Sequence, residues 1–293
     1  MITNASKLAL GTVQFGIPYG IANLTGQVES SEVTRILNLA KTESIFTLDT
    51  AIAYGESESA LGQHDLSEFS VITKLPEVPY GSLDIAEWVN WQLEGSVSRL
   101  KVSTLDALLL HRPSQLLESF GDTLYQKLQG LKQQGIVQRI GISIYEPKEL
   151  DLLCEHFHFD VIQAPFSIID NRLSDSGWLQ RLKGMGTSLH VRSVFMQGLL
   201  LMSRQQRPEK FSRWNDLWIK WEQWLEDTGQ SALQACLRHA LSIPEIEKVV
   251  VGVDSAAQFK QVIHASKGSC LSLPAELSMT DSKLLNPSYW NDL

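Results

Sequence analysis

The chain has 293 residues, of which 43% are apolar and 20% are charged, and its formal net charge is -8. A chain of this size and composition can bury a sizeable core, in one large domain or two small ones. The acidic balance argues against a nucleic-acid partner, because phosphate binding needs clustered lysine and arginine, and no run of about 18 apolar residues occurs that could span a membrane.

The ends of the chain and its cysteines indicate the compartment. Residues Met1–Leu8 lack a basic region followed by an apolar one, so we expect no signal peptide. The three cysteines, Cys154, Cys236 and Cys270, are far apart and fit neither a disulfide framework nor a zinc site. We therefore expect reduced thiols, no bound metal and a cytoplasmic protein.

Short apolar runs alternate with segments of helical spacing along the whole chain. The expected strands cover residues 8–12, 45–48, 70–73, 107–110, 139–143, 160–164, 188–194 and 247–251. Apolar spacing and capping residues predict helices between them, near residues 30–40, 56–63, 85–100, 119–133, 149–156, 178–183, 232–241 and 255–263. Strands that alternate with helices in this way are typical of a (β/α)8 TIM barrel, and no linker divides residues 1–293, so we predict a single barrel domain.

Four ionisable residues of four types follow these strand-like runs. Asp49 follows the run 45–48, and Tyr54 lies in the loop after it. Lys74 follows the run 70–73, and His111 follows an apolar run that ends at residue 110. The carboxyl ends of the strands form the active face of a parallel barrel, so we expect these four side chains to meet there.

The four residue types suit the protonation of a carbonyl oxygen. A lysine ammonium favours a neighbouring phenolate, which would make Tyr54 a usable acid near neutral pH, and a carboxylate would keep that lysine charged. His111 could orient a substrate carbonyl or share in proton transfer. No side chain donates hydride, so such a reaction requires a nicotinamide cofactor. A buried Asp–Lys pair also occurs in barrels as architecture alone, and that alternative stays open at this point.

The motifs around these residues, taken in order, resemble those of the aldo-keto reductases. The matching pieces are LGTVQFG at 10–16, DTA at 49–51, YGESE at 54–58, ITK at 72–74, LLHR at 109–112, GIS at 141–143, and Ser193 through GLL at 198–200. The resemblance implies a catalytic tetrad of Asp49, Tyr54, Lys74 and His111, with Tyr54 as the general acid. It also implies NADP(H) bound across the carboxyl face without a Rossmann domain, in agreement with the absence of a strand followed by G-x-G-x-x-G.

The resemblance assigns the cofactor contacts as well. It implies contacts from Gly11, Thr12, Ser193 and Gly198 in the matching pieces. Ser143 and Gln163 end the fifth and sixth strands, where similar proteins hydrogen-bond the nicotinamide carboxamide.

The seventh strand departs from the family pattern. The family often has a tyrosine before the serine, and its ring stacks on the nicotinamide, whereas this chain has Arg192 before Ser193. We expect the planar guanidinium of Arg192 to stack there instead. The alternative is that Arg192 pairs with an acidic residue or with the cofactor pyrophosphate.

The loop after the eighth strand also departs from the family pattern. Relatives commonly carry Lys or Arg there for the 2′-phosphate of NADP, but this loop has Asp254 and no cation before Lys260. A carboxylate suits a free ribose 2′-hydroxyl and repels a phosphate. The resemblance favours NADP(H), and NAD(H) is possible. We expect Ser255 and Gln258 at the adenosine ribose, with helix capping by Ser255 and a solvated Gln258 as the alternative.

Loops and one helix outside the tetrad are candidates for the substrate side. Topology suggests Phe15, Tyr19, Trp290 and the irregular segment 196–213 as pocket residues, and sugar-like substrates are possible. Tryptophans form one stripe of a helix at positions 214, 218, 221 and 224. The stripe is expected to pack on the outer wall of the barrel; a dimer surface or a wall of the active site are the alternatives.

The leading functional hypothesis is an NAD(P)H-dependent oxidoreductase that reduces an aldehyde or ketone to an alcohol. Its partner would be a small-molecule carbonyl compound, and the protein would be a monomer or a weak homo-oligomer. One alternative is a nicotinamide-binding regulatory or scaffold protein on the same fold with little turnover. Another is a barrel isomerase that uses His111 and Lys74 for proton transfer. The intact set of four residues favours the first hypothesis.

Overall fold

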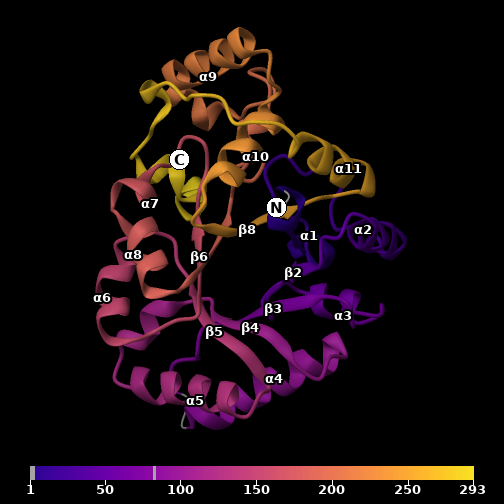
Figure 1. The fold of residues 1–293 in the computed structure, drawn as a ribbon, viewed down its shortest axis with the longest axis vertical. Coiled ribbons are helices and arrows are strands. Elements are labelled where there is room, and N and C mark those ends of the chain that lie inside the picture. The colour runs from indigo at the N-terminus through magenta and orange to yellow at the C-terminus, as the bar shows by residue number, and fades with distance from the viewer. Residues whose placement is uncertain (1–3, 82–83) are drawn as a thin grey trace.

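Eight parallel strands close into a barrel in sequence order in the computed structural model, which describes residues 4–81 and 84–293 (Figure 1). The strands are β1 (Leu8–Gly11), β2 (Thr47–Asp49), β3 (Ser70–Leu75), β4 (Leu105–Leu110), β5 (Val137–Ser143), β6 (Val161–Pro165), β7 (Ser188–Arg192) and β8 (Ile246–Gly252). Leu8 pairs with Val249 and Gly11 with Gly252, which joins the first strand to the last. The predicted (β/α)8 barrel is therefore confirmed, while residues 1–3 of the stretch read for a signal peptide lie outside the described residues.

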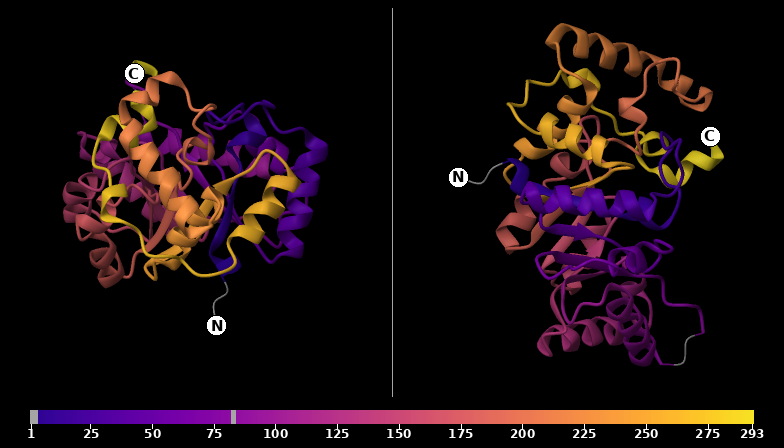
Figure 2. Two further views of the ribbon diagram at one scale, coloured as in Figure 1. Left: turned by 90° about the horizontal axis from the view of Figure 1, so that it is seen from above. Right: turned by 90° about the vertical axis from the view of Figure 1, so that its right-hand side faces the viewer.

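Helices surround the strands (Figures 1 and 2). They are α1 (Val13–Gly16), α2 (Ser30–Thr42), α3 (Ser57–Leu61), α4 (Ile85–Leu100), α5 (Gly121–Gln133), α6 (Glu149–His156), α7 (Arg172–Asp175), α8 (Trp178–Met185), α9 (Asn215–Thr228), α10 (Ala232–Ser242), α11 (Ala256–Ala265) and α12 (Ser282–Leu285). The sequence did not predict α1, α7 and α12, because four residues carry too little periodicity to be recognised. Within the described ranges, no helix combines the length and the apolar character that crossing a bilayer requires.

Local sequence signals begin and end the longer helices. The Asp84 side chain accepts a hydrogen bond from the backbone N–H of Glu87 at the start of α4. That helix buries one apolar stripe and ends at Leu100, and the C-cap residue Lys101 has a left-handed φ of 54°. Ser231 and Gln234 form a reciprocal capping box at the start of α10. These caps lie at helix ends that the apolar spacing of the sequence already predicts closely.

Glu58 ties three elements together near the predicted catalytic loop. Its carboxylate is buried and accepts hydrogen bonds from Thr73 Oγ1 (2.7 Å), Ser96 Oγ (2.6 Å) and Arg99 Nε (2.9 Å). These bonds join α3 to β3 and α4, so they fix the end of the loop that carries Tyr54. The sequence pattern indicated only an acidic residue at a helix start, and nothing in it pointed to this network.

The tryptophan stripe of α9 lies in a second apolar cluster, beyond the barrel core. The cluster joins Trp214, Trp218, Trp221 and Trp224 to the segment after β7 and to the C-terminal segment, including Leu200, Phe211 and Trp290. Trp218 Nε1 donates to the carbonyl of Phe211 (2.9 Å), and Trp221 Nε1 donates to that of Leu200 (3.2 Å). The dimer-surface alternative is therefore wrong, because the tryptophans are buried within the chain. The outer-wall prediction is confirmed in part, because the cluster includes Ala235 and Cys236 of the outer helix α10 as well as the chain's own loops.

We predict an acid-sensitive contribution to stability from His239 on α10. Its ring is buried, stacks on Phe166 (centroids 5.3 Å apart) and has no hydrogen-bond partner for Nε2 among the described residues. Burial lowers the pKa of His239 to about 4 in the folded protein, whereas an unfolded histidine titrates near about 6.5. The unfolded state therefore binds more protons between these values, so this contribution is complete above about pH 6.5 and is lost as the pH falls toward 4.

Replacing His239 with Phe should remove this part of the pH dependence. Urea unfolding at pH 7 and pH 5 should show that His239→Phe loses roughly 1 to 2 kcal/mol less than the wild type over that interval. His264→Phe, at an exposed histidine of α11, is the matched control and should behave like the wild type. Equal losses in all three proteins would contradict the prediction.

Candidate active site

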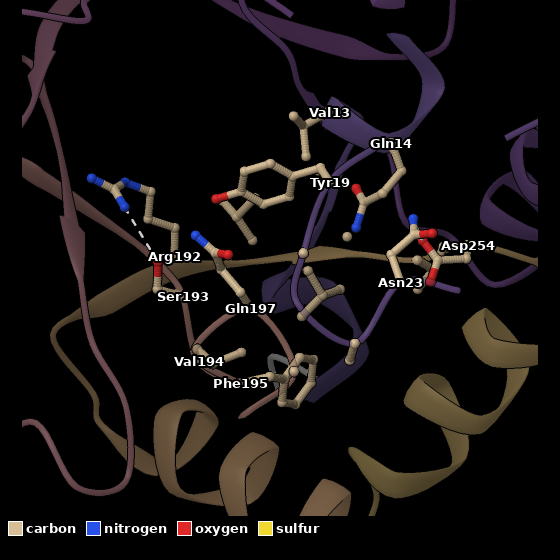
Figure 3. Close-up of a pocket in the computed structure, with 18 of the residues that line it drawn as sticks. Val13, Gln14, Tyr19, Asn23, Arg192, Ser193, Val194, Phe195, Gln197 and Asp254 are labelled. Carbon is tan, nitrogen blue, oxygen red and sulfur yellow. Dashed lines mark hydrogen bonds between the residues drawn. The ribbon is translucent and has the colours of Figure 1, made fainter. Parts of the chain in front are cut away.

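A cavity of about 500 Å³ opens at the carboxyl ends of the strands, within the size range of small-molecule sites. Its lining comes from strand ends and from the loops that follow them, and Figure 3 shows part of it. Gly11, Asp49 and His111 line it from β1, β2 and the end of β4, and Arg192 and Gly252 from β7 and β8. The cavity therefore lies at the face where the strand ends were predicted to deliver their polar residues.

The structure brings the four predicted tetrad residues together. Lys74 Nζ lies 2.6 Å from Asp49 Oδ1 and also donates to the backbone carbonyl of Thr50 (2.8 Å). The same Nζ lies 5.2 Å from the centre of the Tyr54 ring. The Tyr54 and His111 rings meet edge to face, with centroids 5.7 Å apart. Tyr54, His111 and Asp49 line the cavity, while Lys74 is fully buried behind them.

The electrostatic environment of His111 and Tyr54 indicates which of the two can donate a proton. Burial, the largest cause, and the charges of Lys74 and Arg192 together lower the pKa of His111 to about 4. His111 is therefore a neutral imidazole near pH 7, which can hydrogen-bond a ligand but carries no proton to give as an imidazolium. Tyr54 is then the hydroxyl beside His111 that can act as a proton donor in this part of the cavity.

Ser143 and Gln163 are held behind the cavity and are not part of its described lining. Gln163 Nε2 donates to Asp49 Oδ2 (2.6 Å), and Ser143 Oγ donates to Gln163 Oε1 (3.4 Å). Sequence reasoning missed this role of Gln163, which joins β6 to the Asp49–Lys74 pair. The carboxamide contacts assigned to both residues stay a prediction.

Arg192 points its guanidinium toward the loop after β5. It donates to the carbonyl of Ile144 (3.0 Å) and to Ser193 Oγ (3.2 Å), and it lies 4.8 Å from the centre of the Tyr145 ring. The alternative that Arg192 pairs with an acidic residue is wrong, since no described carboxylate lies within ion-pair distance. Stacking on a nicotinamide and contact with a pyrophosphate stay predictions.

The opposite end of the cavity carries the loop after β8. Asp254 Oδ1 accepts a hydrogen bond from Asn23 Nδ2 (3.0 Å), and the Asp254 backbone N–H donates to Gln258 Oε1 (2.8 Å). Ser255 Oγ accepts from the N–H of Gln258 (3.1 Å), so Ser255 caps α11 as the alternative had it. Asp254 and Gln258 line the cavity. The Asn23 contact was missed, because the loop after β1 read only as polar and glycine-rich.

Two features of the lining fit a polar ligand such as a nicotinamide dinucleotide. Gln14 lines the cavity, and its Oε1 atom is buried and has no hydrogen-bond partner among the described residues. A buried acceptor of this kind fits a donor supplied by a ligand. A Cβ atom at Gly252 would approach the Gln14 side chain to 2.5 Å, so glycine there leaves room for that amide. Thr12 and Gly11 also line the cavity, and Thr12 Oγ1 donates to the carbonyl of Asp49 (3.1 Å).

The substrate-side expectations are confirmed only in part. Tyr19 lines the cavity, but Phe15 and Trp290 are buried in the two apolar clusters and are not part of its described lining. The irregular segment contributes Gln197, Gly198 and Leu201 to the lining. Met196 and Gln197 have left-handed backbones with φ of 50° and 54°. Two such non-glycine residues in succession store strain, which is common at binding loops and gives no local sequence signal.

Comparison of the sequence with known protein families identifies the family of the chain. The sequence matches the model of the aldo/keto reductase family over residues 7–272. The chain therefore belongs to the aldo/keto reductase family and is an oxidoreductase of that family. Membership agrees with a parallel barrel that carries its polar cluster at the carboxyl ends of the strands.

Individual relatives are distant. An uncharacterized oxidoreductase of Bacillus subtilis is 24% identical over 281 residues, which cover 89% of this chain and 90% of that protein. An aldo-keto reductase of a Mycobacterium species is 35% identical over 115 residues, 37% of this chain and 39% of that protein.

Solved structures support the fold. The holo form of an aldo-keto reductase from Bacillus halodurans matches with a TM-score of 0.72 and 21% identity, over 91% of this chain and 88% of that one. A glycerol dehydrogenase from Gluconobacter oxydans matches with a TM-score of 0.68 and 22% identity, over the same shares. At these identities the likeness extends to the fold alone.

We predict that the buried Asp49–Lys74 pair is strongly coupled. Asp49→Asn should lower the free energy of unfolding by roughly 2 to 4 kcal/mol, because it leaves the buried Lys74 ammonium without its counterion. Lys74→Met should also destabilise, and the double variant should lose at least about 1 kcal/mol less than the sum of the single losses. Urea titrations followed by tryptophan fluorescence measure all three.

The surface pair Lys41–Glu68, joined at 2.8 Å, is the matched control. The same cycle with Lys41→Met and Glu68→Gln should give a much smaller coupling than the buried pair, because solvent screens the surface charges. A coupling at Asp49–Lys74 no larger than at this surface pair would contradict the prediction.

Proposed function

We propose that the protein reduces an aldehyde or a ketone to an alcohol, with Tyr54 as the proton donor and a nicotinamide dinucleotide as cofactor. The observation that carries this proposal is the contact of Tyr54 with both Lys74 and His111 at the cavity. A proton donor beside a neutral hydrogen-bonding imidazole suits a carbonyl oxygen that gains negative charge.

The chain's own residues would share the work as follows. The Tyr54 hydroxyl gives its proton to the carbonyl oxygen, and the Lys74 ammonium stabilises the phenolate that is left. Asp49 keeps Lys74 charged and fixed in place. Neutral His111 hydrogen-bonds the carbonyl and orients it. A reduced nicotinamide, when bound, supplies the hydride that no side chain can donate.

Several residues are proposed to hold that cofactor. Those with polar side chains can match amide and hydroxyl groups, and the glycines allow close approach. The proposed contacts that line the cavity are Gly11, Thr12, Arg192, Ser193, Gly198, Asp254 and Gln258. Ser143 and Gln163 are proposed to act from behind the cavity, and Ser255 through the cap that it forms on α11.

The residues expected near the adenosine ribose of the cofactor differ from the family pattern. The family resemblance favours NADP(H), while Asp254 presents a carboxylate to the cavity and, in the described ranges, accepts a hydrogen bond from the neutral amide of Asn23 and pairs with no cation. Among the described lining residues no lysine is present and the arginine is Arg192, so a 2′-phosphate would lack a cation near Asp254. This supports NAD(H) as a real competitor to NADP(H).

The remaining proposals concern the whole protein. We infer that residues 1–293 act as one unit on a small carbonyl compound, as a monomer or weak homo-oligomer in the cytoplasm. The free state of Cys154, Cys236 and Cys270 supports that compartment.

Replacing Tyr54 with Phe should separate chemistry from binding. We expect kcat for a panel of aldehydes and keto sugars to fall by about 100-fold or more, because the proton donor is lost, while the cofactor Kd changes little. Stopped-flow or steady-state NAD(P)H absorbance gives kcat, and fluorescence titration gives Kd. Tyr80→Phe, at a fully exposed tyrosine, is the control and should retain wild-type rates.

The same experiment tests the regulatory alternative. A wild type that binds either cofactor tightly but turns over no member of the panel would favour a cofactor-binding protein with little turnover. A Tyr54→Phe variant as active as the wild type would overturn Tyr54 as the acid.

Replacing Asp254 with Asn should shift the cofactor preference. The Asn side chain still accepts a hydrogen bond from Asn23 but carries no charge to repel a phosphate. We expect the ratio of NADPH affinity to NADH affinity to rise about tenfold, which corresponds to about 1.4 kcal/mol. Tryptophan fluorescence titrations measure both Kd values, with Glu276→Gln at an exposed carboxylate as control. An unchanged ratio would exclude Asp254 from the ribose end of the site.

A further inference from the structure

We propose that Arg192 makes the site selective for aldehydes and ketones that carry a carboxylate, by pairing with that carboxylate beside the catalytic residues. This inference rests on the proposed carbonyl reduction and names its substrate class.

The guanidinium of Arg192 is held in a fixed orientation with part of its donor set unused. Arg192 is half-buried at the end of β7 and lines the cavity. Of its five N–H donors, one bonds the Ile144 carbonyl and one bonds Ser193 Oγ, while the plane lies over the Tyr145 ring. These contacts fix the fork, and the described residues supply no acceptor for the other donors. A fork fixed in this way can receive a planar anion at little entropic cost.

The charge of Arg192 is the unbalanced one at this end of the cavity. Asp49, the carboxylate among the catalytic residues, is already paired with Lys74 at 2.6 Å and bonded to Gln163. Within the described residues, no carboxylate comes within ion-pair distance of Arg192. A half-buried cation without a counterion is costly, so an anionic ligand group is favoured here.

The position of this charge points to the substrate rather than to the far end of the cavity. In Figure 3, Arg192 and Ser193 lie on the opposite side from Asn23 and Asp254, with Tyr19 and Gln197 between them. Burial lowers the pKa of His111 and raises that of Tyr19, and the Arg192 charge acts on both groups, lowering each pKa. The charge of Arg192 is thus close enough to act on the His111 imidazole, which would orient the carbonyl.

The single positive charge of Arg192 matches the single negative charge of a carboxylate. A guanidinium fork fits carboxylate and phosphate oxygens alike, but a phosphate monoester carries about two negative charges near pH 7. The groups that surround Arg192 (the Ser193 hydroxyl, the Ile144 carbonyl and the tyrosines Tyr19 and Tyr145) bring no second cation. A singly charged carboxylate therefore suits the site better.

Matched aldehydes test the proposal. We expect the wild type to have a kcat/KM for 4-carboxybenzaldehyde at least about tenfold above that for 4-methylbenzaldehyde, and Arg192→Met to bring this ratio near one. The ratio cancels any effect of the substitution on cofactor binding or on the basal rate. Arg192→Lys should keep part of the preference, because it retains the charge without the fork.

Arg112→Met is the matched control for a change of general charge. Arg112 follows His111 and also acts on its pKa, but its side chain is 62% exposed and pairs with Glu77 at 3.3 Å. We expect this variant to keep the wild-type ratio. A ratio that falls equally in Arg112→Met and Arg192→Met would overturn the proposal, and so would a wild-type ratio near one.

Two further experiments test the carboxylate site with benzoate and compare it with a phosphate ligand. Isothermal titration with benzoate, which needs no turnover, should show at least about tenfold weaker binding to Arg192→Met than to the wild type. If neither aldehyde is reduced, the carbonyl-reductase proposal fails and benzoate alone decides whether the carboxylate site exists. Glyceraldehyde 3-phosphate against glyceraldehyde forms the second arm. A larger Arg192-dependent preference for the phosphate than for the carboxylate would overturn the carboxylate class.

Discussion

The buried ion pair between Asp49 and Lys74 is the constraint on which the site depends. Burying two charges is costly, and the cost is offset only when the pair is close and its remaining oxygens and protons are satisfied. Here Asp49 Oδ2 accepts from Gln163 on β6, and Lys74 Nζ donates to the Thr50 carbonyl. The pair therefore needs β2, β3 and β6 in one closed barrel, so the fold and the chemistry are specified together.

Charge is distributed unevenly along the cavity above that pair. Behind the catalytic end the Asp49–Lys74 charges cancel, which leaves Arg192 as a net positive group there. Asp254 leaves a net negative group at the other end, held by Asn23 rather than by a cation. A ligand assembly that is negative near the carbonyl and offers donors at its far end would be oriented by this field. Arg192 and Asp254, two of the departures from the family pattern, thus carry opposite charges on opposite sides of the cavity.

The sequence predicted the barrel and the meeting of the tetrad because both depend on local patterns. Alternating apolar runs and capped helices define the order of elements, and a parallel barrel brings every strand end to one face. The contacts that were missed join segments far apart in the chain: Glu58 with Ser96, Gln163 with Asp49, and Asn23 with Asp254. Their neighbours in the sequence indicate none of these contacts: Glu58 reads as an acidic residue at a helix start, Gln163 as a cofactor contact and Asn23 as part of a polar loop. Their partners follow from three-dimensional packing, which a single sequence does not specify locally.

The second apolar cluster has its physical explanation in the loop after β7. Ser193, Met196 and Gln197 hold left-handed backbones, which a loop free in solvent would relax. The buried Met196, Leu199 and Leu200 anchor this loop in the cluster of Trp218 and Trp221, and the Trp221 N–H satisfies the Leu200 carbonyl. The tryptophan helix thus keeps a strained segment, and with it Arg192 and Gln197, in one arrangement at the cavity. This support lies in a cluster separate from the barrel core, so the loop that carries Gln197 and the buried Asp49–Lys74 pair are held in place by different sets of contacts.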